Sequence, residues 1–345
     1  MPASETAADL EFERLARDRI KTGSWLDAQQ FAPLEWIVPG LLPEGLSMLA
    51  AAPKTGKSWF AAGVGLACAS GGLALGHIPV ERRPVLYAAL EDGYRRLQSR
   101  YRVLLGDGAR IPAGMSSLID AGTLQELISY CEYFQDVTAT ENRPPLIIVD
   151  TLGRVSPGRS GSQSQYEADY ATGARLQALA KRVPGSSVMV VHHTNKSTHA
   201  DFLNSVSGTQ GVAGAYDAVL VLQRDRKSRD AVLAVTGRDI ENETEYALNS
   251  DGGRWQLMGG NLEASERAVE AMRAEERAEG LGDVKRTIMQ LVSDLEEGDA
   301  ASPAEIALKL GLDSKLIGTR LGELERAGLV VKVGRGRYAP SSHPL

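Results

Sequence analysis

The sequence predicts an α/β fold, in which a mostly parallel β-sheet with flanking helices is followed by a small C-terminal domain. Between residues 36 and 258, short apolar runs rich in β-branched residues alternate with longer helical stretches. This alternation is typical of parallel strands joined by crossover helices. From residue 283 onward the pattern changes to short helical segments that end in a hairpin.

Eight apolar runs define the expected sheet. Five predict parallel strands: Leu46–Ala51, Val85–Leu90, Leu146–Val149, Val188–Val191 and Val219–Leu222. Three more, separated by short turns, predict an antiparallel edge: Ala231–Thr236, Glu245–Leu248 and Arg254–Leu257. Helices are predicted in the gaps: Lys57–Ser70, Tyr94–Leu104, Thr123–Phe134 and Tyr166–Arg182. The polar segments 156–165 and 196–212 are too long for tight turns and are expected to be loops.

The chain is expected to have four parts. Leu10, Phe12, Leu15 and Ile20 are loosely spaced for one helix face, which predicts an arm that packs on its own core or on a neighbour. After residue 260 the sequence becomes rich in Ala, Glu and Arg, which indicates a solvated connecting helix. The parts are a helical arm at 1–35, the sheet-containing core at 36–260, a helical linker at 261–282 and a small domain at 283–345.

Composition excludes several classes of protein. The 345 residues are 43% hydrophobic and 24% charged, with a formal charge of −6, so any contact with nucleic acid must come from local loops or patches. Two cysteines exclude a disulfide framework or a cysteine-based zinc site. No signal region occurs, and no run approaches the roughly 18 apolar residues of a membrane span. We expect a cytoplasmic protein with no membrane contact.

A phosphate-binding loop is predicted between the first long strand and the first long helix. Residues 51–58 are AAPKTGKS, so Ala51 replaces the first glycine of the G-x-x-x-x-G-K-[ST] pattern. Gly56 permits a close approach to phosphate, Lys57 reaches the β and γ phosphates, and Ser58 offers its hydroxyl to Mg²⁺. A plain strand–turn–helix with an exposed lysine is the alternative. The residues expected to contact ATP are Ala52, Pro53, Lys54, Thr55, Gly56, Lys57, Ser58 and Trp59.

Two carboxylates end strands that should reach the same edge of the sheet. Asp150 ends PPLIIVD, the form of a Walker B strand, and can hold Mg²⁺. Glu91 follows VLYAAL and can activate a water molecule. Alternatively, Asp150 caps the next segment, and Glu91 belongs with Asp92 to the start of a helix. The three segments together favour a nucleotide site.

At this point the sequence resembles a known family. The segments LLPEGLSMLAAAPKTGKS, ALED, IIVDTL, VVHHTNK and GRD resemble the RepA-type hexameric replicative helicases of plasmids and phages, an AAA-like group in the RecA/DnaB-like superfamily of P-loop ATPases. The resemblance covers about residues 36–258, and the order and spacing of the motifs carry it. It implies a RecA-like core, hydrolysis of ATP with Mg²⁺, a homo-hexameric ring and single-stranded DNA in its pore.

The resemblance also implies roles for individual residues. Glu91 would be the catalytic base, and the Thr that follows Asp150 supports this, since other P-loop classes place a glutamate there. His193 corresponds to a sensor of the γ-phosphate, although His192 and His193 also fit a turn-facing pair. Arg238 corresponds to an arginine finger that enters the neighbouring subunit. A solvated Arg238 paired with Asp239 or Glu241 is the alternative, and Arg224 and Arg226 are competing candidates.

The two polar loops correspond to pore loops in such rings. Two basic residues within these loops, Arg159 and Lys196, are expected to contact DNA phosphates. Arg154, which lies just before the first loop, is expected to do the same. Neither loop is strongly basic, so ordinary surface loops remain the alternative.

The C-terminal domain resembles a winged helix-turn-helix. Ser302 and Glu305 form a predicted capping box, the turn Gly311–Asp313 leads into a second helix, and a hairpin with Gly334 and Gly336 at its tip follows. Residues expected to contact duplex DNA are Lys315, Arg320, Lys332, Arg335 and Arg337. Acids are about as frequent as bases here, so docking of a protein is the alternative.

Three functions agree with these motifs. The first is a DNA helicase that serves the replication of a plasmid, a phage or another mobile element. The second is a non-motor ATPase switch whose C-terminal domain binds specific DNA or a partner. The third is an initiator or helicase loader.

Overall fold

A nine-stranded sheet forms the centre of the part that the structure describes, which comprises residues 7–139, 143–155, 165–193, 215–224, 228–279, 282–295 and 299–341 of a computed structural model. In spatial order its strands are β13 (Arg254–Leu257), β12 (Thr244–Asp251), β11 (Asp230–Gly237), β10 (Ala218–Arg224), β3 (Gly45–Ala51), β9 (Ser187–His193), β8 (Leu146–Asp150), β6 (Val85–Ala89) and β7 (Met115–Leu118). The six strands from β10 to β7 are parallel, and β11, β12 and β13 continue the sheet antiparallel. The predicted α/β fold with a mostly parallel sheet is confirmed.

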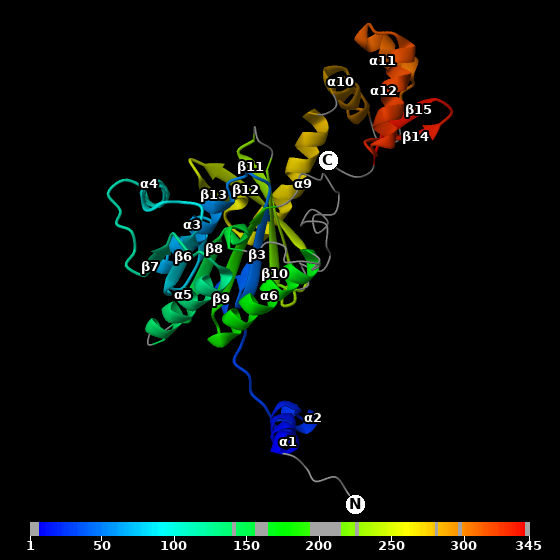
Figure 1. The fold of residues 1–345 in the computed structure, drawn as a ribbon. Coiled ribbons are helices and arrows are strands. Elements are labelled where there is room, and N and C mark those ends of the chain that lie inside the picture. Colours follow the sequence, from blue (N-terminus) through cyan, green and yellow to red (C-terminus); the bar gives the residue numbers. More distant parts are fainter. Residues whose placement is uncertain are drawn as a thin grey trace, which may run out of the picture. The chain divides into compact units, whose positions relative to one another are not determined.

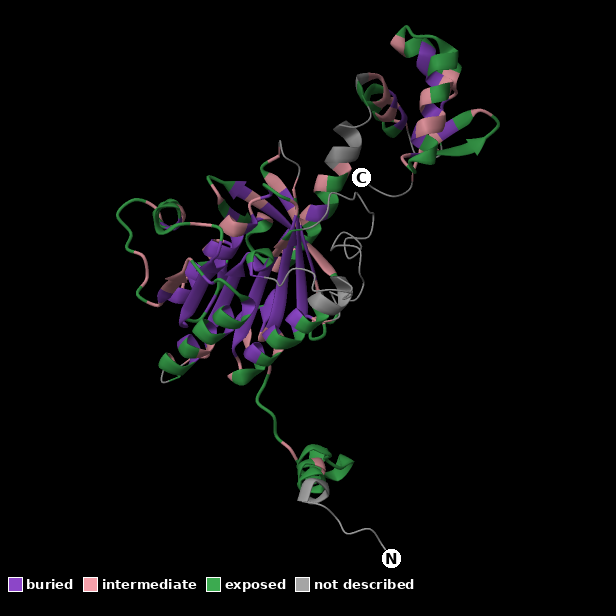
Figure 2. Cartoon of the chain, viewed as in Figure 1, coloured by how far each residue is buried: buried purple, intermediate pink, exposed green. Residues whose placement is uncertain are grey.

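Helices cover both faces of this sheet (Figure 1). On one face, α3 (Lys57–Ser70) and α4 (Tyr94–Leu105) pack against alternate strand residues such as Tyr87 and Ile148. On the other, α5 (Leu124–Val137) and α6 (Gln165–Arg182) pack against the intervening residues such as Ile147 and Val149. Successive side chains of a strand point to opposite faces, so both faces must be apolar when both are covered. Figure 2 shows the strands buried between the helices.

Local sequence explains these elements. The strand β8 reads LIIVD and is buried at every position, as the central strand of a covered sheet requires. The helix α3 is rich in Ala and Gly, and a side chain at Gly65 would lie 3.1 Å from Ile148, so a small residue lets the helix approach the sheet. The helix α5 begins where Thr123 accepts a hydrogen bond from the amide of Glu126. The predicted strands and helices of the core are confirmed to within three residues at each end.

Several short elements are not predicted by the sequence. They are β1 (Trp36–Val38) with β2 (Leu42–Pro43), β4 (Leu73–Ala74) with β5 (Ile78–Pro79), the edge strand β7, and the 3₁₀ turns η1 (Leu152–Arg154) and η2 (Met258–Gly260). The strand β7 reads MSSL, and only its first residue is buried. An edge strand with polar residues lacks the apolar run that identifies the inner strands.

Residues 1–35 form a compact unit of their own. It contains α1 (Ala7–Arg19) and the short α2 (Gly23–Asp27), which begins where Thr22 accepts a hydrogen bond from the amide of Trp25. Several large apolar side chains of this unit are exposed: Phe12, Leu15, Ile20, Trp25, Leu26 and Phe31. No helix in the described part of the chain is long and apolar enough to cross a membrane.

The sheet is followed by α9 (Leu262–Glu279), which packs on β12. The Ser265 hydroxyl donates to the carbonyl of Ala247 at 2.7 Å, and Arg273 forms an ion pair with Glu245 at 2.7 Å. These contacts, one in the first turn of α9 and one beyond its middle, attach the helix to β12.

The C-terminal elements have a core of their own. They are α10 (Gly282–Ser293), α11 (Pro303–Leu310), α12 (Ser314–Arg326), β14 (Val330–Gly334) and β15 (Arg337–Pro340). Ile288, Ile306, Ile317, Leu321 and Leu324 are buried in this core. The predicted capping box is present, because Ser302 and Glu305 exchange both hydrogen bonds. The order helix, helix, helix, hairpin is the one expected from the sequence.

Candidate active site

The side chains predicted to act on ATP lie at the carboxyl edge of the parallel strands. The register pairs Ala51, the last residue of β3, with His193, the last of β9. It likewise pairs Ala89 with Asp150, which places the turn that carries Glu91 beside Asp150. Because parallel strands all end at one edge, four segments distant in sequence meet there.

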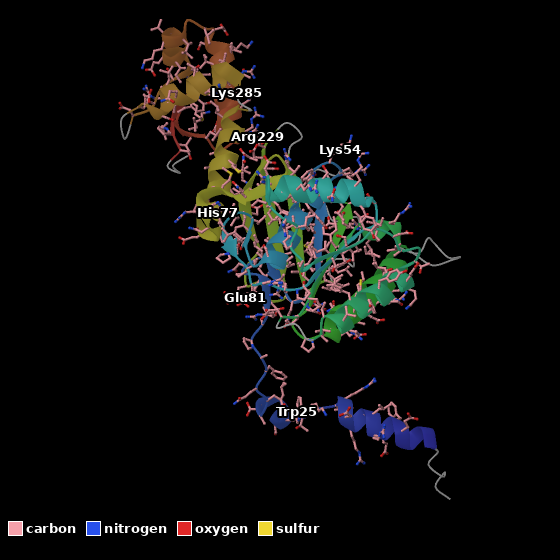
Figure 3. The ribbon with its side chains drawn as sticks, turned by 90° about the vertical axis from the view of Figure 1, so that its left-hand side faces the viewer. Trp25, Lys54, His77, Glu81, Arg229 and Lys285 are labelled. Atoms are coloured by element: carbon pink, nitrogen blue, oxygen red, sulfur yellow. The ribbon has the colours of Figure 1, made fainter. Side chains whose placement is uncertain are left out.

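The loop 52–56 has the backbone geometry of an anion site. Gly56 stands immediately before α3 with φ 105°, and Lys54 has φ 69°. Thr55 closes the loop, since its hydroxyl donates to the carbonyl of Ala52 at 2.8 Å. Lys54 is exposed at this end of the core (Figure 3). The N-terminus of α3 therefore presents unpaired amides and the positive end of its dipole to this loop.

The replacement of the first motif glycine by alanine is accommodated in this geometry. Ala51 is still part of β3, is buried, and pairs with Leu222 as well as His193. Its φ lies outside the left-handed region, where a glycine would be needed.

Lys57 contacts His193 directly. The ammonium nitrogen lies 2.8 Å from Nδ1 of the imidazole. Burial lowers the pKa of Lys57, against the opposing effect of Asp150 and Glu91. Burial and the charge of Lys57 lower the pKa of His193. A protonated lysine donates to Nδ1, which places the proton of a neutral imidazole on Nε2.

Asp150 is held by a buried tyrosine. The hydroxyl of Tyr87 donates to Oδ2 of Asp150 at 2.6 Å and lies 3.2 Å from the carbonyl of Ser58. Burial, and then Asp150, raise the pKa of Tyr87 well above its usual value, so the phenol stays protonated and remains a donor. This contact joins Ser58 and Asp150, the two residues expected at Mg²⁺.

The donor chemistry at this position fits Mg²⁺ held jointly by protein and phosphate. Ser58 and Asp150 supply a hydroxyl and a carboxylate, which are oxygen ligands of the kind that Mg²⁺ prefers. Among the described residues, no group of three or more His, Cys, Asp or Glu side chains could hold a metal alone. A site with only two protein ligands suits a Mg²⁺ ion that arrives already bound to the phosphates of a nucleotide.

Glu91 is oriented by the residue that follows Asp150. The hydroxyl of Thr151 donates to Oε1 of Glu91 at 2.6 Å. The amide of Leu90 also donates to the carbonyl of Asp150 at 2.8 Å, so the two strand ends are joined by backbone as well. One oxygen of Glu91 is thus fixed and the other is available for a water molecule.

The antiparallel edge supports the phosphate loop from outside. The indole nitrogen of Trp255 donates to the carbonyl of Gly56 at 3.2 Å, and the guanidinium of Arg224 lies 5.4 Å from the centre of the indole ring. A cavity of about 400 Å³ opens here and is lined by Lys54, Gly56, Trp59, Arg224, Arg229, Ser250, Asp251, Gly252, Gly253 and Trp255. It adjoins the loop and has room for parts of a nucleotide beyond its phosphates.

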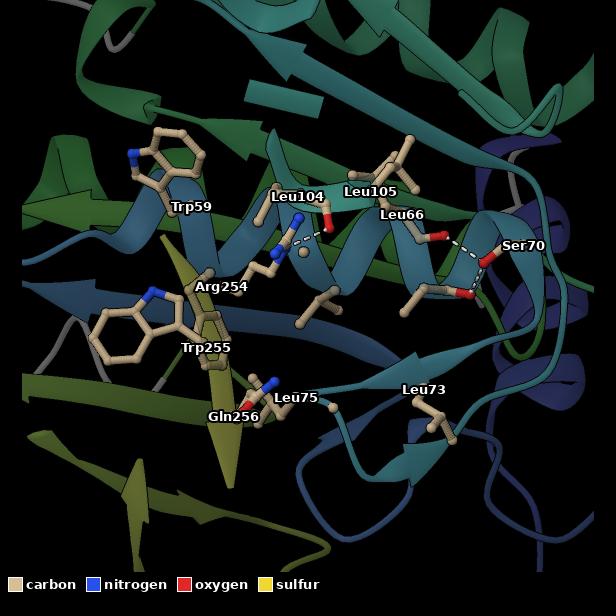
Figure 4. A pocket seen from close by; sticks show the side chains of 15 residues that line it. Trp59, Leu66, Ser70, Leu73, Leu75, Leu104, Leu105, Arg254, Trp255 and Gln256 are labelled. Carbon is tan, nitrogen blue, oxygen red and sulfur yellow. Dashed lines mark hydrogen bonds between the residues drawn. The ribbon is translucent and has the colours of Figure 1, made fainter. Parts of the chain in front are cut away.

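A second cavity, of about 250 Å³, runs along α3 (Figure 4). Its walls come from α3, from Leu104 and Leu105 at the end of α4, and from β13, where Arg254 donates to the carbonyls of Val103 and Leu104. Neither Lys57 nor Asp150 lines it. This cavity therefore does not reach the predicted phosphate contacts, although Trp59 and Trp255 line both cavities.

The arginines proposed as fingers lie at opposite ends of β10 and β11. Arg224 ends β10 on the side of the phosphate loop. Arg238 follows β11 at the amino edge of the sheet, where it lies 3.5 Å from Asp217, whose amide donates to the carbonyl of Leu46. Arg238 is thus remote from the predicted site in its own chain. Arg226 lies outside the described residues.

The predicted DNA contacts are spread over several segments. Arg154 is exposed in η1, and Arg159 and Lys196, with most of both predicted loops, lie outside the described residues. In the C-terminal unit, Arg320 pairs with Glu323 and Lys332 lies 6.0 Å from the ring of Tyr338. Arg337 donates to the carbonyl of Ala300. Lys315 and Arg335 are exposed.

Sequence reasoning missed four residues that hold the site together: Tyr87, Thr151, Arg224 as a neighbour of the loop, and Trp255. The sequence did carry a signal for Tyr87, which is a single polar aromatic residue two positions before the end of an otherwise aliphatic strand. In the register of the sheet, Tyr87 is the diagonal neighbour of Asp150 and lies on the same face. No local pattern identifies Trp255, which is 199 residues from Gly56 in sequence.

Comparison with known proteins gives a family and a fold. A model of an AAA domain family (AAA_25) matches residues 11–199, more than half of the chain. No curated protein matches the sequence. The structure is similar to that of a DnaB-like replicative helicase described with its interactions with primase, with 12% identity and a TM-score of 0.50 over 73% of this chain and 67% of that one. That likeness is one of fold, and it agrees with the expected RecA-like core.

Two further solved structures match over a smaller share of the chain. They are a KaiC-like protein of Pyrococcus horikoshii OT3 and the RadB recombinase, each with a TM-score of 0.44 over 64% of this chain. The identities are 14% and 15%, over 93% and 91% of the respective chains.

Proposed function

The chain belongs to the AAA domain family, and on that premise we propose that it is an ATP-dependent DNA helicase of RepA type, a ring of identical subunits that moves along single-stranded DNA. Membership of the family and the chemistry of the site together support an ATPase. The observation that carries the proposal is the meeting of Lys57, Glu91, Asp150 and His193 at the carboxyl edge of one parallel sheet.

Binding of ATP would use the loop and the start of α3. The amides at this helix end and the ammonium of Lys57 attract the phosphates. Lys57 then exchanges its contact with His193 for a phosphate oxygen, because an anion is the stronger acceptor. Ser58 and Asp150 would hold Mg²⁺, which supplies neutralisation of phosphate charge when bound.

Hydrolysis would use Glu91 as the general base. The free carboxylate oxygen accepts a proton from water as the water oxygen attacks the γ-phosphorus, and the bond to the leaving ADP oxygen breaks. Thr151 keeps the other oxygen in place. Orientation of this kind lowers the entropic part of the barrier.

Coupling to DNA would begin at His193. It ends β9 directly before the segment 196–212, which we propose to contact DNA in the pore through Lys196. Release of phosphate changes the partner of His193, and the adjoining segment can follow. Arg238 would complete the site of the next subunit, which implies head-to-tail contacts that close into a ring.

A second candidate function is a non-motor ATPase switch. One observation favours it: three of the five basic residues predicted to bind duplex DNA contact groups within the C-terminal unit itself, namely Arg320, Lys332 and Arg337. In addition, Leu308 of that unit is 86% exposed. A surface of this kind suits a protein partner better than a phosphate backbone.

Mass measurement of the native assembly tests the proposal. The protein is measured alone, with a non-hydrolysable ATP analogue, and with the analogue plus single-stranded DNA, and ATPase rates are taken with single strands and with duplexes. The helicase predicts a ring that retains single-stranded DNA and an ATPase stimulated by single strands of any sequence. A monomer under all three conditions, or stimulation by one particular duplex only, would favour the switch.

A further inference from the structure

We propose that Arg100 is a positioning residue for the ATPase reaction, and the inference rests on the function proposed above. Arg100 lies on α4, outside every motif of the family resemblance. Its guanidinium joins the turn that carries the base Glu91 to the start of α3, which carries Lys57 and Ser58. The arginine thereby sets the distance between the base and the phosphate site.

The contact with the turn is a buried ion pair. Nη2 of Arg100 lies 2.6 Å from Oδ2 of Asp92, and the side chains are only 10% and 11% exposed. Asp92 is the residue directly after Glu91, and its amide donates to the carbonyl of Ala89 in the same turn. Burial weakens screening by solvent, so this pair restrains the turn more firmly than a surface pair would.

The contact with the phosphate site is made through Trp59. The guanidinium carbon of Arg100 lies 5.6 Å from the centre of the indole ring. Trp59 directly follows Ser58 in the first turn of α3. The indole also packs closely against Gly253, where a Cβ would lie 2.4 Å from Trp59 Cε3. The indole thus contacts both Gly253 and Arg100 at the start of α3.

Arg96 provides an internal comparison. It pairs with the other oxygen of the same carboxylate, at 2.9 Å from Asp92 Oδ1, but its side chain is 71% exposed. Of the two arginines, only Arg100 lies over Trp59. Arg96 can therefore balance the charge of Asp92, whereas Arg100 balances this charge and also bridges the two halves of the site.

The position of Arg100 is costly for stability. Its Nε and Nη1 groups are buried without a hydrogen-bond acceptor among the described residues. Unpaired buried donors destabilise a fold, so stability alone does not account for an arginine at this position. Lysine would keep the charge but is a poorer substitute, because an ammonium lacks the planar face with which a guanidinium stacks on an indole.

The test compares four full-length proteins: wild type, Arg100→Met, Arg100→Lys and Arg96→Met. Methionine keeps most of the side-chain volume without adding a buried polar group. For each protein, kcat, KM for ATP, the Kd of a non-hydrolysable analogue and the melting temperature are measured. We expect Arg100→Met to lower kcat about tenfold. We expect Arg100→Lys to lower kcat about threefold, since the pair with Asp92 remains but the contact with Trp59 is lost.

Comparison of the change in kcat with the changes in KM and Kd separates a positioning role from a general loss of structure. A positioning role leaves KM and Kd within about twofold of wild type while kcat falls. Arg96→Met should match wild type in all four measurements. Arg100→Met and Arg100→Lys proteins that both keep the wild-type kcat overturn the inference, as does an Arg96→Met variant with the same loss of kcat. If Arg100→Met does not fold, Arg100→Lys decides by the same criterion.

The same measurements separate this inference from the proposed function. A wild-type protein without ATPase activity overturns both. An active wild-type protein whose Arg100→Met and Arg100→Lys variants are both equally active overturns the inference alone.

Discussion

The ammonium of Lys57 and the imidazole of His193 lie 2.8 Å apart, so the two groups expected to meet the terminal phosphate hold each other. They come from α3 and from the end of β9, 136 residues apart in sequence. In the proposed ATPase, a phosphate that takes the lysine would release the histidine. Arrival of ATP would thus be communicated to the end of β9 by the exchange of one hydrogen-bond partner.

Replacement of the lysine should abolish turnover. In Lys57→Ala, the phosphates lose their main cation, and we expect kcat/KM for ATP to fall by at least about 10³-fold. Steady-state ATPase assays measure this, with Lys181→Ala on the exposed side of α6 as the control. A Lys57→Ala protein that retains a tenth of the activity would place the phosphates elsewhere.

Replacement of the base should separate binding from hydrolysis. Glu91→Gln keeps an oxygen that can accept from Thr151 but cannot take a proton from water. We expect kcat to fall about 10²–10⁴-fold while the analogue binds as it does to wild type. Single-turnover assays and equilibrium binding measure the two quantities. Hydrolysis at the wild-type rate would mean that another group is the base.

Removal of the tyrosine hydroxyl should weaken the response to Mg²⁺. In Tyr87→Phe the ring still packs, but Asp150 loses the donor that orients it. We expect the Mg²⁺ concentration for half-maximal activity to rise about tenfold. A titration with Mg²⁺ at saturating ATP measures this. The control is Tyr101→Phe, which loses only a contact with Ser117 at 3.3 Å; equal shifts in the two variants would contradict the role of Tyr87.

The stability of the protein should depend on the charge of His193. Its pKa is lowered below 6.5 in the folded state, mainly by burial, so just below pH 6.5 the unfolded chain binds more protons than the folded one. The stabilising contribution is complete above pH 6.5 and is lost as the pH falls through the lowered pKa. Between about pH 7.5 and about pH 5.5, we expect the melting temperature to fall more steeply for wild type than for His193→Gln. Parallel slopes would show that His193 does not titrate in this way.

The proposed arginine finger should act across a junction between subunits. We expect Arg238→Ala to lower ATPase activity about 10³-fold, because charge on the transferred phosphoryl group is no longer balanced. Mixing it with the inactive Lys57→Ala protein should restore activity, since some junctions then combine an intact lysine with an intact arginine. Activity that stays absent at every mixing ratio would argue against a finger in trans.

The core of the fold could be predicted because buried parallel strands have a clear pattern. Strands such as β8 are continuous aliphatic runs, and α3 begins at Lys57, as its motif requires. The edge strand β7 and the short pairs near residues 36 and 73 have no such pattern, since tertiary contacts rather than local preference hold them.

The site could be predicted only in part, for a related reason. The motifs identified the side chains expected to face the phosphates, because each motif stands at a regular distance from the end of a strand. Their supports, Tyr87 for Asp150 and Thr151 for Glu91, depend on register between strands, which the sequence alone leaves open. The roles of Glu91, Asp150, His193 and Arg238 and the boundaries of the four parts remain predictions.

The support of Gly56 by Trp255 has a consequence for synthesis on the ribosome. The phosphate loop leaves the exit tunnel before β10, the neighbour of β3, and before Trp255, which is 199 residues further along the chain than Gly56. A nascent chain that has reached residue 199 contains every matched family residue, yet it lacks one flank of the central strand and the indole beneath the loop. The nascent polypeptide should therefore acquire affinity for nucleotide only after Trp255 has left the exit tunnel.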